Sequence, residues 1–369
     1  MDPAFSSDKQ AASFATLLAA ILLLPVLAGE PLLPDRAEIY KSIPWRFGGH
    51  PCFQKTIFEG EKPLDIALIG SSHIWSGVDP VYLSAELTKS LGRESVVRTL
   101  GWNWPGFDAL YFTAEDLLEN RKVKLLVVNN EFTTWVGRTQ PHRLASRWFR
   151  LGDNGRDLAG LGLEEKAVYY ASSVLGMPRN LLGMTRASLP IRPSAELEFS
   201  PEKLYRTEDP EIRLGALRTE LNYFSHKTTF LPFKPRMSAE PQEIVVWSDE
   251  NRERFGTSGP NLPKRQLHFV RKLADLARKH NATLLFIHLP SLDDTGGDRI
   301  LESAIWPEIL GENVRYAGVP PAALFRGMTE KEIAALFYDP KHLNRNGQEY
   351  FTPIITPIII QIFNEISGR

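Results

Sequence analysis

The stretch Asp65-Ile-Ala-Leu-Ile-Gly-Ser-Ser-His-Ile-Trp-Ser-Gly77 is an apolar run that ends abruptly in glycine, two serines and a histidine. The run from Ile66 to Ile69 contains no polar residue, which is typical of a strand buried on both faces of a parallel sheet. In such sheets ligands bind at the carboxyl ends of the strands. Ser71 and Ser72 follow this strand directly, so both are candidates for chemistry, although serine is also an ordinary turn residue.

Strand and helix patterns alternate on both sides of a central interruption. Asp79 is expected to cap a helix that has Pro80 at its first position. The other expected strands are 96–100, 123–128, 283–289 and 314–316, and the other expected helices include 109–119 and 266–280. This alternation predicts an α/β fold with a parallel sheet of about five strands and right-handed crossovers.

The region 132–263 breaks this alternation and is rich in aromatic residues, arginine and proline. We interpret it as a mixed helical insertion or lid over the carboxyl edge of the sheet; an independent second domain is the alternative. Insertions at that edge commonly carry substrate selection. The expected organisation is therefore a linker at 34–63, then an α/β domain at 64–369 that contains the insertion.

The N-terminal segment, residues 1–33, contains a run from Gln10 to Gly29 without any charged residue. A helix needs roughly 20 apolar residues to cross a bilayer, and this run is just long enough. A retained membrane anchor is the favoured interpretation, ahead of a signal peptide cleaved after Ala28 and of a buried soluble helix. With an anchor the remaining chain is expected to lie outside the cytoplasm, and with cleavage it is secreted.

The composition excludes several classes of protein. With 369 residues, 43% hydrophobic and 24% charged, the chain is that of a globular protein. The formal net charge of -1 gives no basic field that would attract nucleic acid. The single cysteine, Cys52, excludes an intrachain disulfide and a cysteine-based metal cluster. We expect no metal and no cofactor.

A second informative stretch lies near the C-terminus, from Phe337 to Phe351. Asn344 is the expected N-cap of the last helix, so Asp339 and His342 lie in the loop before it. A carboxylate three residues before a histidine can turn back to the imidazole Nδ1–H. That contact fixes the tautomer and leaves Nε2 free to act as a base.

These stretches resemble the four sequence blocks of the SGNH (GDSL-like) hydrolase superfamily, which supply Ser, Gly, Asn and His in that order. The matching stretches are Gly70-Ser71-Ser72, Gly101 to Gly106, Asn129-Asn130-Glu131 and Asp339 to Asn344. The chain departs from the family pattern at two positions, because Ser71 replaces Asp and Asn129 replaces Gly. The resemblance covers about 64–130 and 282–363, and not the region between them.

The resemblance implies a site and a fold. Ser72 would be the nucleophile, His342 the base, and Asp339 the residue that orients the imidazole. The oxyanion would be held by the Ser72 and Gly106 backbone N–H groups and by the Asn130 side-chain amide. His73, His288 and Glu131 are interpreted as structural. The fold implied is a flavodoxin-like three-layer sandwich.

An N-terminal apolar helix before such a domain is similar to the membrane-anchored bacterial proteins that acylate or deacylate cell-envelope polymers. The resemblance implies O-acyl (acetyl) transfer from an acyl donor to a polysaccharide or glycoconjugate acceptor. It also implies a periplasmic catalytic domain and a multispanning membrane acyltransferase as partner. The alternatives are a carbohydrate esterase of the same fold and a catalytically silent module that binds glycan or docks a partner.

Overall fold

The computed structural model describes residues 6–27, 35–41, 43, 53–103, 105–129, 141, 145–148, 155–188, 245–246, 248, 263–292, 311, 313–337 and 340–368 of the 369-residue chain. The chain forms two compact units. The first contains Met1–Ile43 and Gln140–Pro193, and the second contains Pro44–Thr139 and Ser194–Arg369. The candidate site belongs to the second unit.

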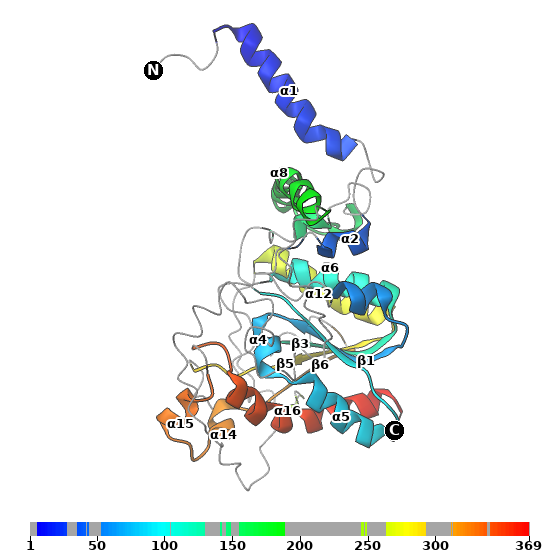
Figure 1. The fold of residues 1–369 in the computed structure, drawn as a ribbon, viewed down its shortest axis with the longest axis vertical. Coiled ribbons are helices and arrows are strands. Elements are labelled where there is room, and N and C mark those ends of the chain that lie inside the picture. Colours follow the sequence, from blue (N-terminus) through cyan, green and yellow to red (C-terminus); the bar gives the residue numbers. More distant parts are fainter. Residues whose placement is uncertain are drawn as a thin grey trace. The chain divides into compact units, whose positions relative to one another are not determined.

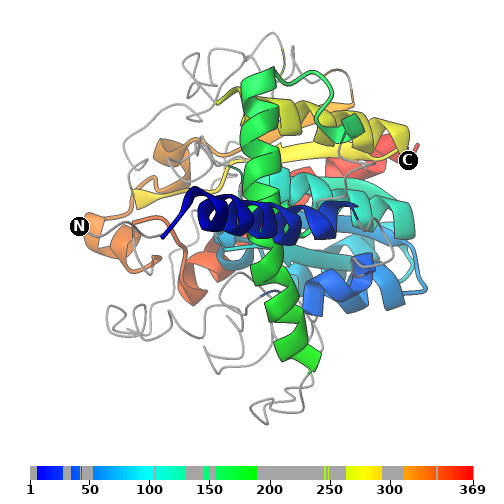
Figure 2. The same cartoon turned by 90° about the horizontal axis from the view of Figure 1, so that it is seen from above.

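The first unit is helical and joins the N-terminal segment to part of the region predicted as an insertion. Its elements are α1 (Asp8–Leu27), α2 (Arg36–Lys41), the 3-10 turn η4 (Ala145–Arg147) and α8 (Leu163–Ser188). Helix α8 is a single long helix that contacts α1, α2 and η4 (Figure 2). The ring of Tyr40 meets Trp148 edge-on, with centroids 5.7 Å apart. Within the described residues, no helix combines the length and hydropathy needed to cross a bilayer.

The second unit is an α/β structure built on one sheet (Figure 1). Its strands are β1 (Leu64–Gly70), β2 (Val97–Gly101), β3 (Val123–Asn129), β4 (Val245–Val246), β5 (Thr283–Ile287) and β6 (Val314–Gly318). They lie in the order β2-β1-β3-β5-β6-β4. The first five strands of this order are mutually parallel, and the two-residue β4 is antiparallel to β6. The predicted parallel sheet of about five strands is confirmed.

Helices cover both faces of this sheet (Figure 1). On one face α6 (Phe107–Asn120) packs against α12 (Lys264–Lys279), and on the other α5 (Pro80–Leu91) packs against α16 (Arg345–Ile366). The shorter helical elements are η3 (Lys55–Glu59), α4 (Ser72–Gly77), α14 (Pro321–Leu324) and α15 (Glu330–Ala334). The opening strand is buried along its whole length, as its uninterrupted apolar run predicts.

Two predicted helix caps are also present. The Asp79 carboxylate accepts hydrogen bonds from the Val81 and Tyr82 backbone N–H groups at the start of α5. The Asn344 side chain accepts from the Gly347 N–H at the start of α16. These caps matter because they fix where the loops that carry the candidate residues end.

Candidate active site

The candidate nucleophile lies at the carboxyl edge of the sheet, between β1 and α4. Ser71 is the N-cap of α4, and its hydroxyl accepts a hydrogen bond from the His73 backbone N–H at 3.2 Å. Ser72 is the first residue of the helix and is only 7% exposed. Because the first N–H groups of a helix have no intrahelical acceptor, the Ser72 N–H is left for a ligand or a neighbouring group.

The structure brings Ser72 and His342 together across 270 positions of sequence. The Ser72 Oγ and the His342 Nε2 are 2.7 Å apart, which is a hydrogen-bond distance. His342 is held in the loop before α16 because the Asn344 amide donates to the Ala335 and Phe337 carbonyl oxygens, at 2.8 and 3.2 Å. A serine hydroxyl on a fixed imidazole nitrogen is the arrangement that activates a serine nucleophile.

The loop that follows β2 lies next to the nucleophile's strand. Gly70 and Gly101 are paired in the sheet, and the Trp102 N–H donates to the Gly70 carbonyl oxygen at 2.8 Å. Gly106, further along this loop, is the N-cap of α6 and is buried. A Cβ at this position would lie 2.4 Å from the Asp108 Oδ1, so a larger residue here would require the Asp108 side chain to move.

Gln266 fixes the end of this loop from α12. Its Oε1 accepts a hydrogen bond from the Phe107 backbone N–H at 2.7 Å, and the side chain is fully buried. Helix α6 therefore begins at Phe107, two residues before the predicted start at Ala109. A glutamine 159 positions away therefore supplies an acceptor for the first N–H group of α6, whose N-cap residue is a glycine without a side chain.

Replacing Gln266 with leucine is expected to lower the free energy of unfolding by about 1–3 kcal/mol, because the buried Phe107 N–H loses its acceptor. Denaturant unfolding monitored by circular dichroism measures this change. Gln361→Leu is the matched control, since Gln361 is exposed on α16, and its cost should stay within about 0.5 kcal/mol. Equal unfolding midpoints for the two variants would show that the capping bond contributes nothing.

His73 forms part of the surroundings of the Ser72–His342 pair. It is 6% exposed, and its ring packs edge-on against the His342 ring, with centroids 4.5 Å apart. Burial lowers the pKa of His73 well below the usual histidine value, and the neighbouring His342, Lys341 and His288 lower it further. His73 therefore stays neutral where an exposed histidine would begin to bind a proton.

This lowered pKa gives stability a defined pH dependence. Below the ordinary histidine pKa of about 6.5 the unfolded state binds a proton at His73 that the folded state does not. The contribution of His73 to the free energy of unfolding is therefore fully present above that pH. It falls as the pH decreases from there toward the folded-state pKa, by up to about 1.4 kcal/mol per pH unit for one proton. Urea unfolding between about pH 7.5 and 5.5 should show this fall, and His73→Phe should reduce it. An identical pH dependence in His73→Phe would contradict the assignment.

The sequence-predicted residues divide into two groups. Ser72 and His342 are in contact, and Gly106 lies in the loop that follows the neighbouring strand. Asp339, Asn130 and Glu131 lie outside the described residues. His288 is buried, and its backbone N–H donates to the Ala317 carbonyl oxygen at 3.0 Å, which continues the pairing of β5 with β6.

Two side chains that contact the candidate site segments were given no role from sequence. Asn129, the last residue of β3, hydrogen-bonds to Ser71, and Gln266 holds the start of α6. The position of Asn129 at a strand end was a signal that could have drawn attention to it. For Gln266 no sequence signal exists, because its partner is set by the packing of α12 against α6.

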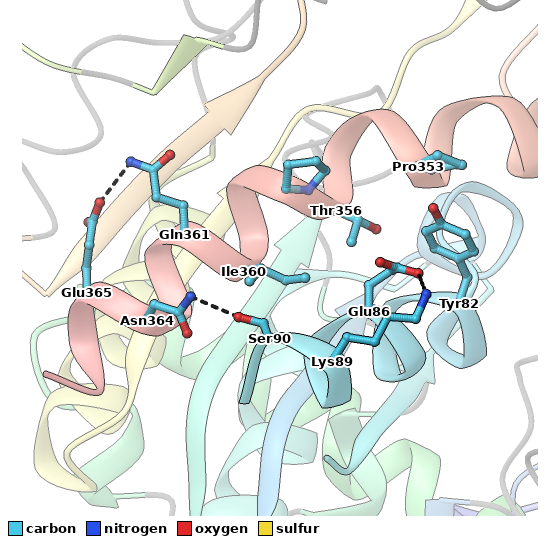
Figure 3. Close-up of a pocket in the computed structure, with 11 residues that line it drawn as sticks. Tyr82, Glu86, Lys89, Ser90, Pro353, Thr356, Ile360, Gln361, Asn364 and Glu365 are labelled. Atoms are coloured by element: carbon cyan, nitrogen blue, oxygen red, sulfur yellow. Dashed lines mark hydrogen bonds and ion pairs between the residues drawn. The ribbon is translucent and has the colours of Figure 1, made fainter. Parts of the chain in front are cut away.

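A separate groove lies between α5 and α16 and has a volume of about 720 Å³ (Figure 3). Its lining does not include Ser72, His342 or Gly106. Many of its polar side chains are bonded to one another, through the pairs Glu86–Lys89, Ser90–Asn364 and Gln361–Glu365 (Figure 3). We assign no ligand to this groove. Among the described residues, no group of three or more histidine, cysteine, aspartate or glutamate side chains could hold a metal ion.

Comparison of the chain with models of known protein families and with curated proteins finds no match.

Proposed function

We propose that this protein carries out serine-dependent acyl-ester chemistry on a cell-envelope polysaccharide or glycoconjugate, and that it transfers an O-acyl group through an acyl-enzyme on Ser72. The observation that carries the proposal is the 2.7 Å contact between the Ser72 Oγ and the His342 Nε2 at the carboxyl edge of a parallel sheet. Both partners come from stretches that resemble SGNH sequence blocks. The contact adds a geometric relation between these two stretches to the resemblance of each.

In the first half of the reaction His342 Nε2 takes the Ser72 hydroxyl proton while the oxygen attacks the carbonyl carbon of an acyl ester. The tetrahedral intermediate then breaks its bond to the leaving oxygen, which receives the proton from His342. In the second half an acceptor hydroxyl attacks the acyl-enzyme as His342 removes its proton. The bond between the acyl carbon and the Ser72 Oγ then breaks, His342 returns the proton to that oxygen, and the acyl group stays on the acceptor.

The negative oxygen of the tetrahedral intermediate needs hydrogen-bond donors. We assign this role to the Ser72 N–H, the Gly106 N–H and the Asn130 side-chain amide, and assign to Asp339 the orientation of the His342 ring. Two observations favour the assignment. Ser72 begins α4, so its N–H has no acceptor within the helix, and Gly106 is buried in the loop after the neighbouring strand.

The fold we propose is the flavodoxin-like three-layer type of the SGNH superfamily. When the five parallel strands are numbered 1 to 5 in chain order, their order across the sheet is 2-1-3-4-5. That order, with helices on both faces, supports the proposal. It also puts the ends of β1, β2 and β3 side by side, where the first three sequence blocks lie.

The proposed location is the outer face of the bacterial cell membrane, with residues 1–33 as an anchor or a cleaved signal and the catalytic domain in the periplasm. Helix α1 exposes Phe14, Leu17 and Leu18, and these apolar side chains favour an apolar environment around this part of the helix. A multispanning membrane acyltransferase is the proposed partner that supplies the acyl donor. No nucleic acid or cofactor takes part in the proposed reaction.

The acceptor of the acyl group decides between transfer and hydrolysis. Purified protein would be incubated with an acetyl-ester donor and a de-O-acetylated polysaccharide, and separately with the acetylated polysaccharide alone. A gain of polymer-bound acetyl groups that depends on Ser72 identifies a transferase, and their loss identifies an esterase. Unchanged acetyl content in both incubations, together with unchanged function of Ser72→Ala in the cell, would reject the enzymatic proposal in favour of a silent binding module.

A further inference from the structure

Asn129 makes two buried hydrogen bonds to the residue that precedes the candidate nucleophile. Its Oδ1 accepts from the Ser71 backbone N–H at 2.8 Å, and its Nδ2 donates to the Ser71 Oγ at 3.0 Å. Asn129 is the last residue of β3 and is 4% exposed. The oxygen and the nitrogen of this buried side-chain amide therefore both bond to the turn between β1 and α4.

The neighbouring backbone is shaped to admit this amide. A Cβ at Gly70 would lie 1.9 Å from the Asn129 Oδ1, which no ordinary side-chain packing allows. Glycine at the end of β1 leaves the space that the asparagine side chain fills. Gly70, Ser71 and Asn129 thus form one fitted group.

This group reaches both sides of Ser72. The Ser71 backbone is held directly by Asn129, and the Ser71 Oγ also accepts from the His73 N–H at 3.2 Å. The residues before and after Ser72 are therefore connected to the same asparagine side chain. Ser72 itself is left with its Oγ on His342 and its N–H at the start of α4.

We propose that Asn129 is a positioning residue, which holds the turn that carries Ser72 so that the Ser72 Oγ meets His342 and the Ser72 N–H faces the reacting carbonyl. The inference rests on the proposed acyl-enzyme chemistry and deepens it. It also gives a function to two departures from the SGNH pattern, because Ser71 and Asn129 are hydrogen-bonded to each other. Asn129 acts through Ser71 and is not assigned a contact with substrate.

Removing the hydrogen bonds between Asn129 and Ser71 should lower the rate of reaction and leave the affinity for substrate unchanged. Misplacing a reacting group by about 1 Å can cost about 100-fold in rate. We therefore expect Asn129→Ala to lower kcat about 100-fold with KM changed by less than about threefold. The second-order rate of Ser72 modification by a small fluorophosphonate should fall in parallel, because this probe makes few contacts beyond the serine.

Asn313→Ala is the matched control. Like Asn129, Asn313 donates a hydrogen bond from its side-chain amide, in this case to the Ala274 backbone carbonyl oxygen at 3.4 Å, but it precedes β6 at the opposite edge of the sheet. This variant should keep kcat and the labelling rate within about twofold of the wild type. Thermal unfolding of Asn129→Ala and Asn313→Ala shows whether each variant is folded at the temperature of the kinetic measurement.

A second variant keeps the test decisive if Asn129→Ala does not fold. Ser71→Ala retains the bond from the Ser71 N–H to Asn129 but removes the hydroxyl and its bonds to the Asn129 Nδ2 and the His73 N–H, so it should lower kcat by about tenfold. The double variant should lose less than the product of the two single losses, because both single changes break the same bond between the Asn129 Nδ2 and the Ser71 Oγ. Fully additive losses would contradict a shared positioning role.

The outcomes separate this inference from the proposed function. Fluorophosphonate labelling that persists unchanged in Ser72→Ala rejects the proposed function itself. Labelling that requires Ser72 but proceeds at the wild-type rate in folded Asn129→Ala and Ser71→Ala rejects only the positioning role. A rise in KM with unchanged kcat in Asn129→Ala would also overturn it, since that pattern reports a loss of binding.

Discussion

Replacing Ser72 with alanine is expected to lower acyl turnover by at least about ten-thousand-fold, because the variant lacks the oxygen that forms the acyl-enzyme. Whatever rate remains would come from binding and from the oxyanion donors alone. The measurement is the release of product from an activated acetyl ester, followed over the same pH range for wild type and variant. Circular dichroism should show no loss of helix, since Ser71 and not Ser72 caps α4.

Ser76→Ala is the matched control for this variant. Ser76 is a second buried serine on the same six-residue helix, and its hydroxyl donates to the His73 carbonyl oxygen at 3.4 Å. It should retain turnover within about threefold of the wild type. Equal turnover in Ser72→Ala and Ser76→Ala would remove Ser72 from the mechanism.

Replacing His342 with alanine is expected to produce a loss of the same order as Ser72→Ala, because the serine hydroxyl then has no base to take its proton. The two residues act as a unit, so the double variant should be no slower than either single variant. Steady-state kinetics of the three variants on one activated ester measure this directly.

The control for His342 is His280→Ala, at the C-terminal end of α12 and away from the carboxyl edge of the sheet. It should leave turnover within about threefold of the wild type. If His342→Ala and Ser72→Ala showed multiplicative losses in the double variant, the two residues would be acting independently, and the contact between them would not be the catalytic one.

The sheet could be predicted from sequence because its central strands are apolar on both faces. The runs around Leu68, Val127 and Phe286 leave no polar face for solvent, so each is confined to the interior of a parallel sheet. The exact ends of elements were less predictable. Helix α6 begins at Phe107 because Gln266 reaches it from α12, and that contact exists only after the two helices have packed.

The central pair of the site could also be predicted, because each partner carries a local sign of its position. Ser72 follows a buried strand, and His342 precedes the helix that Asn344 caps. Neither sequence feature gives the distance between the two side chains, because that distance depends on how helix α16 packs against the sheet. The bond between Asn129 and Ser71 could not be predicted for the same reason, since it joins the ends of two different strands.

The bond between Asn129 and Ser71 gives a physical account of the two positions at which the chain differs from the SGNH blocks that it resembles. In the sequence, Ser71 and Asn129 are the two positions that differ from the SGNH blocks. In the structure Ser71 caps α4 and is fixed by Asn129, while Gly70 provides the room that the asparagine needs. The turn between β1 and α4 is therefore supported by hydrogen bonds between two uncharged side chains, those of Ser71 and Asn129, and from Asn129 to the Ser71 backbone.

The most direct test of the central claim is to identify the residue that becomes covalently modified. Wild-type protein would be incubated with a fluorophosphonate, its intact mass measured, and the modified peptide sequenced by tandem mass spectrometry. We predict a single adduct on Ser72, formed more slowly in His342→Ala and at the wild-type rate in Ser76→Ala. The absence of an adduct, or an adduct elsewhere that persists in Ser72→Ala, would contradict a serine nucleophile at the end of β1.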